Sequence, residues 1–292
     1  MCRWIAYSGS PVLMADLLYR PKHSLIVQSL HSQLGAEETN GDGFGVGWYG
    51  DQETPAVFHS IEPAWNDRNL RELAGHIVSP LGFAHIRAST GSPVQQTNCH
   101  PYRHGRWLWM HNGLIGDFLE VKRDLVFEID PSLYREMEGT TDSEVLFLLA
   151  LTYGLEDDPP TAVERAIGLV EAVGERHGVE HPMQGTIATT DGESLWAFRY
   201  SSEGKSRSLF HSTDAGTLKA QHPDNPVLHQ VSDASRLIVS EPCGDLAGAW
   251  NEVPESNCVV IDAGREALQP FTPRRPDDAG TTPSRPATAA AS

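Results

Sequence analysis

The second residue of the chain, Cys2, carries a side chain that can act as a nucleophile. If Met1 is removed, one residue holds both a thiol and a free α-amine. A thiol is a strong nucleophile only as the thiolate, and its unperturbed pKa is about 8.5. An α-amine with a pKa of about 8 can accept that proton at neutral pH. Cys2 could therefore supply nucleophile and base together, although a small buried residue that opens a strand is the simpler interpretation of these two residues alone.

Attack on a carbonyl also needs hydrogen-bond donors at the oxygen that becomes negative. Asn112 and Gly113 are the candidates, because asparagine offers a side-chain NH2 group and glycine leaves its backbone N–H unhindered. They follow an apolar segment at 106–110, which is expected to be a central strand, and we expect residues 111–113 to form a turn. An ordinary Asn-Gly hairpin turn is the competing interpretation.

A charged α-amino-acid substrate needs partners for its carboxylate and its ammonium group. Arg87 ends a predicted strand at 82–87 and can bind a carboxylate through two hydrogen bonds, to which Thr90 could add a third. Asp142 lies at a predicted helix start and could bind the ammonium group. A surface ion pair for Arg87 and a helix cap for Asp142 are the competing interpretations.

Other chemistries fit the sequence less well. The glycine run at 41–47 has neither the G-x-G-x-x-G spacing nor a Walker lysine. Cys99, His100, His104 and His111 lack the paired spacing of a zinc site, so we expect surface loop histidines and one turn histidine. A G-x-S-x-G nucleophile elbow is absent. We expect no metal and no organic cofactor, because the thiolate would do the covalent work.

The composition and net charge limit the kinds of molecule that the protein is expected to bind. The 292 residues are 39% hydrophobic, and the net charge is −17 with a sequence pI of about 5.1. Such an acidic surface repels phosphates, so we expect neither nucleic acid nor an anionic membrane as a partner. No apolar run approaches the roughly 18 residues of a membrane span, and the start is no convincing signal peptide. We expect a cytoplasmic protein whose four cysteines are free thiols.

A glycine-rich segment at 44–49 is expected to be a strand with one bare face. Glycine alternates there with larger apolar residues, which permits close approach by another backbone or by a ligand. The segment follows a strong turn signal at 40–43. A buried strand at 2–7 is expected to end at Gly9 and Pro11.

The rest of the chain has a pattern of strands, then helices, then strands. Helices are expected at 66–75, 141–151 and from 159, and further strands at 55–59, 185–190, 194–200, 208–212, 236–240 and 258–262. This order predicts one α+β domain at 2–271 with layered antiparallel sheets. Residues 272–292, rich in Pro, Thr and Ala, are expected to form a disordered tail.

Five segments together resemble the class II glutamine amidotransferase domain, a member of the N-terminal nucleophile hydrolases. They are Met-Cys at 1–2, Asn-Gly-Asp-Gly-Phe-Gly at 40–45, Arg-Ala-Ser-Thr at 87–90, His-Asn-Gly at 111–113 and Thr-Asp-Ser-Glu at 141–144. Their order and rough spacing match as well. The resemblance implies a four-layer αββα sandwich of two antiparallel sheets. It also implies a small-molecule substrate, glutamine or a γ-glutamyl amide, cleaved through a γ-glutamyl thioester.

The resemblance implies a role for each candidate residue. Cys2 would be the nucleophile, with its own α-amine as the base. Asn112 and Gly113 would form the oxyanion hole. Arg87 and Thr90 would bind the substrate carboxylate, and Asp142 would bind the substrate ammonium group.

At several positions the chain differs from the large synthases of the family and resembles its stand-alone members. The chain begins Cys-Arg-Trp at 2–4, where large synthases usually have Cys-Gly-Ile, and Ser-Glu-Pro at 240–242 matches the stand-alone group. That group includes the γ-glutamyl hydrolase of ergothioneine synthesis. No synthase domain is expected after residue 271, so an ammonia acceptor would be a partner enzyme. The sequence leaves open a glutaminase, a hydrolase of one γ-glutamyl metabolite, an acylase and a non-catalytic binding module, and it gives no oligomeric state.

Overall fold

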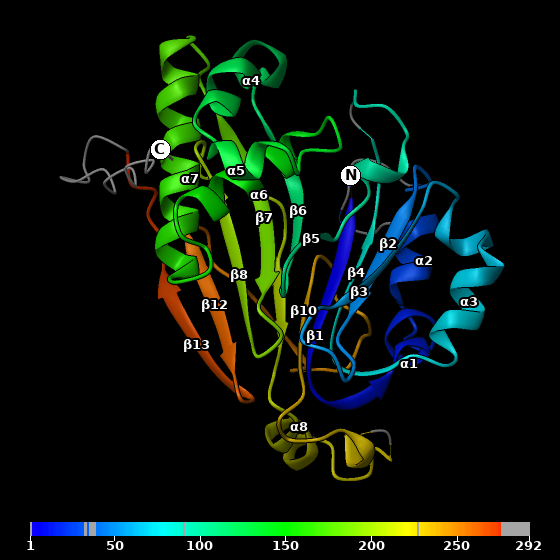
Figure 1. The fold of residues 1–292 in the computed structure, drawn as a ribbon. Helices are drawn as coiled ribbons and strands as arrows, with labels where there is room; N and C mark the ends of the chain where they lie inside the picture. Colours follow the sequence, from blue (N-terminus) through cyan, green and yellow to red (C-terminus); the bar gives the residue numbers. More distant parts are fainter. Residues whose placement is uncertain (1, 32–33, 35–38, 90, 227, 276–292) are drawn as a thin grey trace, which may run out of the picture.

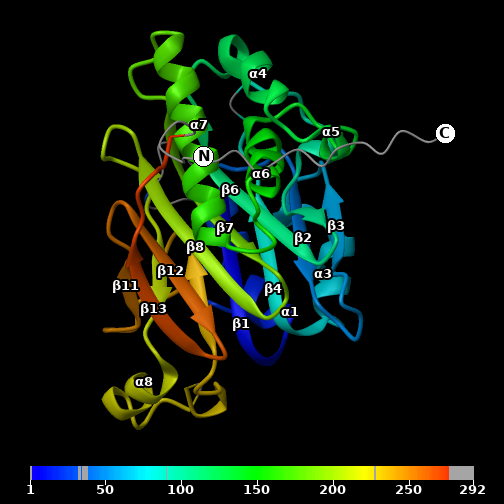
Figure 2. The ribbon, with the colours of Figure 1, turned by 60° about the vertical axis from the view of Figure 1, so that its left-hand side comes forward.

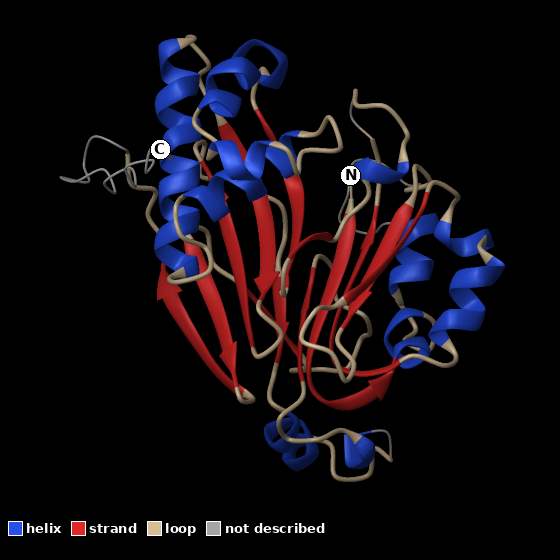
Figure 3. Ribbon diagram, in the orientation of Figure 1, coloured by secondary structure: helices blue, strands red, loops and turns tan. Residues whose placement is uncertain are grey.

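The fold consists of two antiparallel sheets packed face to face, with helices on both outer faces (Figures 1 and 3). The structure is a computed structural model, and it describes residues 2–31, 34, 39–89, 91–226 and 228–275. These four layers confirm the predicted αββα sandwich. Each sheet is therefore covered on both faces, which explains why its central strands are apolar on both sides.

The first sheet has the N-terminal strand at its centre. Its order is β11 (Trp250–Glu252), β9 (Phe210–Ser212), β10 (Arg236–Val239), β1 (Arg3–Leu13), β4 (Val78–Ile86), β2 (Phe44–Trp48) and β3 (Ala56–Ser60). The outer face of this sheet is covered by α1 (Met14–Leu18), α2 (Leu25–Leu30) and α3 (Arg68–Ala74).

The second sheet carries the longer helices. Its order is β13 (Arg265–Pro270), β12 (Asn257–Asp262), β8 (Ser194–Ser201), β7 (Met183–Thr190), β6 (Trp107–Ile115) and β5 (Tyr102–His104). Its outer face is covered by α4 (Phe118–Phe127), α5 (Pro131–Tyr134), α6 (Asp142–Thr152) and α7 (Pro159–Arg176), as Figure 2 shows. A separate helix, α8 (Ala215–Gln221), lies below both sheets (Figure 1).

The two sheets share a core between their inner faces. Trp4 and Phe83 of the first sheet are fully buried in one cluster with Leu108 and Met110 of the second. The indole N–H of Trp4 donates to Thr186 Oγ1 across the interface at 3.1 Å. Thus the residues next to Cys2 in the chain anchor the first sheet to the second.

Strand β1 is longer than predicted. It continues to Leu13, although Gly9 and Pro11 were expected to end it. Its pairing with β4 shifts register between Ser8 and Val12, so these residues form an irregularity within the strand. A bulge tolerates proline because it leaves one backbone position outside the ladder.

The helical predictions agree with the structure at α6 and α7. Thr141 is the N-cap of α6, and its Oγ1 accepts the backbone N–H of Glu144 at 3.2 Å. The predicted apolar stripe of α7 is fully buried against the core and consists of Val163, Ile167, Val170 and Val173.

Residues 272–275, which we expected to belong to a disordered tail, lie along α7. The backbone N–H of Arg274 donates to Glu164 O at 3.0 Å, and its guanidinium pairs with the Glu164 carboxylate at 2.5 Å. The rest of the predicted tail, 276–292, lies outside the described residues. Among the described residues, no helix is both long enough and apolar enough to span a membrane.

The bare face of β2 receives another piece of backbone, as the alternating glycines predicted. A Cβ atom at Gly45 would lie 2.1 Å from the carbonyl oxygen of His100, and one at Gly47 would lie 2.8 Å from Pro101 Cγ. Contacts below 3.0 Å are not found for real Cβ atoms. The two glycines therefore let the segment that carries His100 cross directly over the sheet.

Gly45→Ala is expected to destabilise the fold by about 2–3 kcal/mol, because the added methyl group meets backbone that cannot move aside without shifting β2. Urea unfolding monitored by circular dichroism measures this change. Gly50→Ala is the matched control, since a Cβ there meets nothing within 4 Å. Equal stability of the two variants would contradict the close approach.

Candidate active site

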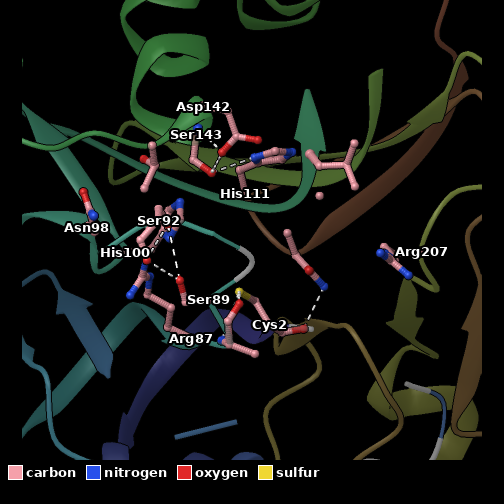
Figure 4. Close-up of a pocket in the computed structure, with 15 residues that line it drawn as sticks. Cys2, Arg87, Ser89, Ser92, Asn98, His100, His111, Asp142, Ser143 and Arg207 are labelled. Atoms are coloured by element: carbon pink, nitrogen blue, oxygen red, sulfur yellow. Dashed lines mark hydrogen bonds between the residues drawn. The ribbon is translucent and has the colours of Figure 1, made fainter. Parts of the chain in front are cut away.

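One pocket collects the predicted site residues from separate parts of the chain. Cys2, Arg87, Asn112, Gly113 and Asp142 all line it (Figure 4). Thr90, the sixth predicted residue, lies outside the described residues. Five positions spread over 140 residues of sequence thus meet where the ends of β1, β4 and β6 converge with the start of α6.

Cys2 immediately precedes the central strand β1 and is half-buried. Its Sγ lies 3.4 Å from the backbone nitrogen of Ala88 and 3.5 Å from the carbonyl oxygen of the same residue. Burial raises the pKa of the Cys2 thiol, an effect that the Ala88 contact and the charge of Arg87 only partly oppose. The resting side chain is therefore a neutral thiol, which needs a base before it can attack.

The backbone of Cys2 is held by two donors. Arg3 Nη1 and Asn112 Nδ2 each donate to the carbonyl oxygen of Cys2 at 2.8 Å. Arg3 Nε in turn pairs with Glu241 Oε1 at 2.6 Å, and the two side chains are 4% and 3% exposed. This buried ion pair links the Cys-Arg start to the Ser-Glu-Pro segment at 240–242, two features that the sequence left unconnected.

Glu241→Gln is expected to destabilise the protein by about 3 kcal/mol, because it leaves the Arg3 charge buried without its counter-charge. The double variant Arg3→Met/Glu241→Leu should recover most of that loss, because it removes both charges. Urea unfolding of the two variants measures the difference.

Asp262→Asn is the control for that comparison. It breaks an exposed pair with Arg265, whose side chains are 57% and 83% exposed, and should change stability by less than about 0.5 kcal/mol. A Glu241→Gln effect no larger than this control would contradict a buried, mutually dependent pair.

Asn112 and Gly113 lie inside β6, so the predicted turn at 111–113 is wrong. Gly113 pairs with Gly185 of β7, and a Cβ on Gly113 would lie 2.0 Å from the carbonyl oxygen of Gln184. The two facing glycines let the strands approach closely, and the ladder continues where an isolated Asn-Gly pair would turn.

The N–H of Gly113 points toward the pocket side of β6. Strand β5 pairs with β6 only as far as Trp109 among the described residues, so the edge beyond is open. Ile115 uses this open edge to donate its N–H to Asp142 Oδ2 at 2.9 Å. Alternate residues of a strand direct their N–H groups to the same edge, so Gly113 faces the same way.

Arg87 is buried at the end of β4 and takes part in no ion pair of the described chain, so a surface ion pair is wrong for it. Its Nη2 donates to Ser92 Oγ at 2.7 Å, to Ser89 Oγ at 3.2 Å and to Pro93 O at 3.1 Å, while Nη1 donates to Asp42 O at 3.3 Å. Figure 4 shows the guanidinium beside Ser89 and Ser92. A carboxylate at Arg87 would have to share or replace these loop contacts.

Asp142 connects the first turn of α6 to β6. Its Oδ1 accepts the backbone N–H of Ser143 at 2.8 Å, while Oδ2 accepts the N–H of Ile115. The cap of this helix is Thr141, so the Asp142 carboxylate remains partly exposed and lines the pocket.

Buried histidines line part of the pocket, and the sequence analysis did not predict this position for them. His100 and His111 line it and are 4% and 1% exposed, so placing them on a surface loop and in a turn was wrong. The ring of His85 contacts that of His100 in a tilted arrangement, with ring centroids 4.3 Å apart. Burial lowers the pKa of His85 to about 3 and lowers those of His100 and His111, so these rings are neutral. The bare face of β2 was the only sequence signal for this burial.

His104 is the remaining member of the Cys and His residues considered for a metal site. His104 is the last residue of strand β5, so its placement in a loop was wrong; it is partly exposed, and its Nδ1 lies 2.7 Å from Glu136 Oε2. Within the described ranges, no group of three or more His, Cys, Asp or Glu side chains is arranged to hold a metal ion.

Comparison with known proteins identifies the family. Residues 19–275 match the family described as glutamine amidotransferases class-II. The probable glutamine amidotransferase DUG3 of Saccharomyces cerevisiae is 33% identical over 306 residues, which cover 93% of this chain and 84% of the yeast protein. The γ-glutamyl-hercynylcysteine sulfoxide hydrolase of Mycolicibacterium smegmatis is 28% identical over 274 residues, which cover 93% of this chain and all of that protein.

Solved structures agree with this result. A glutamine aminotransferase class-II domain protein from Silicibacter pomeroyi has a TM-score of 0.71 and 31% identity, covering 94% of this chain and 100% of that one. The glutamine phosphoribosylpyrophosphate amidotransferase of B. subtilis, at a TM-score of 0.60 and 15% identity, shares the fold. The fold is that of the N-terminal nucleophile type of amidotransferase domain. The chain belongs to the class II glutamine amidotransferases.

Proposed function

We propose that the protein is an amidohydrolase that cleaves the γ-amide of glutamine or of a γ-glutamyl conjugate through a thioester on Cys2. The observation that supports this most is the meeting of a thiol, oxyanion donors, a buried arginine and a carboxylate in one pocket. The family match begins at residue 19, so the role of Cys2 is argued from its surroundings.

The first step uses the two functional groups of Cys2. With Met1 removed, the α-amine takes the thiol proton, and the thiolate attacks the γ-carbonyl carbon to form a C–S bond. This base is needed because burial raises the pKa of the Cys2 thiol. The proton then passes from the α-ammonium to the departing nitrogen as the C–N bond breaks, and water later hydrolyses the thioester to glutamate.

The negative oxygen formed during attack needs donors that are already in place. Asn112 Nδ2 carries two hydrogens, one of which is given to the Cys2 carbonyl at 2.8 Å, so the second can bind the oxyanion. The N–H of Gly113 on the open edge of β6 would be the other donor. The hydrogen bond from Asn112 to the Cys2 carbonyl would also keep the proposed oxyanion donor at a fixed position relative to the proposed nucleophile.

The substrate head group would be bound by opposite charges. A glutamyl group carries a carboxylate and an ammonium on one carbon, which complements Arg87 and Asp142 in the same pocket. Thr90 remains our proposed third contact to the carboxylate. A simple acyl amide has neither charge, so this pair of side chains favours a γ-glutamyl hydrolase over an acylase.

An uncleaved N-terminal extension that places residues before Cys2 should lower glutaminase kcat by at least about 100-fold, because it converts the base into a neutral amide. Removing the extension with a protease that leaves Cys2 first should restore turnover. Glutamate release from glutamine or γ-glutamyl substrates measures both. Full turnover by the extended protein, verified by intact mass, would contradict the proposed mechanism.

A further inference from the structure

His100 differs from the other buried polar residues that line the candidate active-site pocket. Neither of its ring nitrogens has a hydrogen-bond partner in the described part of the chain, although the residue is only 4% exposed. In the same pocket, Asn98 Oδ1 accepts the backbone N–H of Thr140 at 2.9 Å. Ser143 Oγ lies 2.8 Å from His111 Nδ1. A polar group that is buried without a partner is unfavourable, and a ligand in the pocket would supply one.

Two aromatic rings hold the His100 ring in place. Its centroid lies 4.3 Å from that of His85 and 4.5 Å from that of Tyr102. The carbonyl oxygen of His100 packs directly on Gly45, where a Cβ atom would lie 2.1 Å away. The ring is therefore positioned before a ligand arrives, and binding does not have to order it.

The protonation state of His100 decides which groups it can bind. Burial lowers the pKa of His100, so its imidazole is neutral and has one N–H donor and one acceptor nitrogen. It can therefore donate to a carboxylate or accept from an ammonium group. The glutamyl head group of the function proposed above carries both, and this inference rests on that function.

A substrate carboxylate at Arg87 needs a further donor. Arg87 Nη2 has two hydrogens, yet three acceptor oxygens of the chain already lie within 3.2 Å of it. Asp142 Oδ2, in contrast, accepts only the N–H of Ile115 among the described residues, so it can still accept from an ammonium group. Figure 4 shows His100 on the same side of Cys2 as Arg87. The carboxylate is therefore the group that needs His100.

We propose that His100 binds the substrate by donating its N–H to the α-carboxylate of the glutamyl group, beside Arg87. Arg87 then supplies the charge, and His100 supplies a donor that no group of the described residues uses. The α-carboxylate takes no part in the reaction, so the contact is equally strong in the bound substrate and in the transition state. It therefore contributes to KM and not to kcat.

The test uses two analogues of glutamate, the product of every γ-glutamyl substrate. Glutarate lacks the ammonium group, and 4-aminobutyrate lacks the α-carboxylate. Each is measured as a competitive inhibitor of glutamate release from L-glutamine or its γ-methylamide by the full chain with Cys2 as its first residue. His100→Phe should raise the KM of the substrate and the Ki of glutarate by about tenfold or more, as one charge-assisted hydrogen bond allows. The Ki of 4-aminobutyrate and kcat should stay unchanged.

His100→Leu should give the same result and serves where the phenyl variant does not fold, whereas His100→Gln keeps an N–H donor and should lose less. His76→Phe is the matched control, because His76 is exposed and lies outside the pocket.

An unchanged Ki of glutarate in His100→Phe or His100→Leu would overturn the carboxylate contact and leave the proposed function intact. A rise confined to 4-aminobutyrate would also overturn it, because His100 would then bind the ammonium group. An equal rise for both inhibitors would overturn it as well, because it indicates a general change of the pocket. If wild-type protein cleaves no γ-glutamyl compound, the proposed function and this inference both fail.

Discussion

The site depends on how the backbone of Cys2 is held. Its carbonyl oxygen accepts hydrogen bonds from Arg3 and Asn112, and Arg3 is itself fixed by the buried carboxylate of Glu241. A chain end is normally among the least ordered parts of a protein. Here the chain enters the central strand of a seven-stranded sheet directly after Cys2, so this strand positions the Cys2 side chain.

Close approach of backbones builds the rest of the pocket. Gly45 and Gly47 admit the segment of His100 onto the face of β2, and Gly113 meets Gly185 between β6 and β7. In both places the absence of a side chain lets two backbone segments pack directly against each other. The neutral histidines that enter with this segment add polar groups without adding charge, which leaves Arg87 and Asp142 as the charged partners for a substrate on that side of Cys2.

Local signals predicted the parts of the fold that local forces determine. Short sequence segments determine three such features, which are the Thr141 cap, the buried stripe of α7 and the bare face of β2. The turn expected at 111–113 failed because Gly185, the residue that keeps the strand going, lies 72 positions away in the sequence. Helix α4 was not predicted, since its exposed Leu119 and Phe127 obscure the apolar periodicity. Similarly, the Arg3–Glu241 pair joins residues 238 positions apart, and no short pattern encodes such a contact.

The central claim is that one residue supplies an unblocked amine and a reactive thiol inside a pocket for a glutamyl group. Peptide-resolved mass spectrometry after treatment with a glutamine-like diazo-ketone tests this most directly. We predict an N-terminal peptide that begins at Cys2 and carries one adduct, with excess glutamine protecting it and the buried Cys99, Cys243 and Cys258 left unlabelled. A retained Met1 on active protein, or an adduct on another cysteine with Cys2 unmodified, would contradict the account.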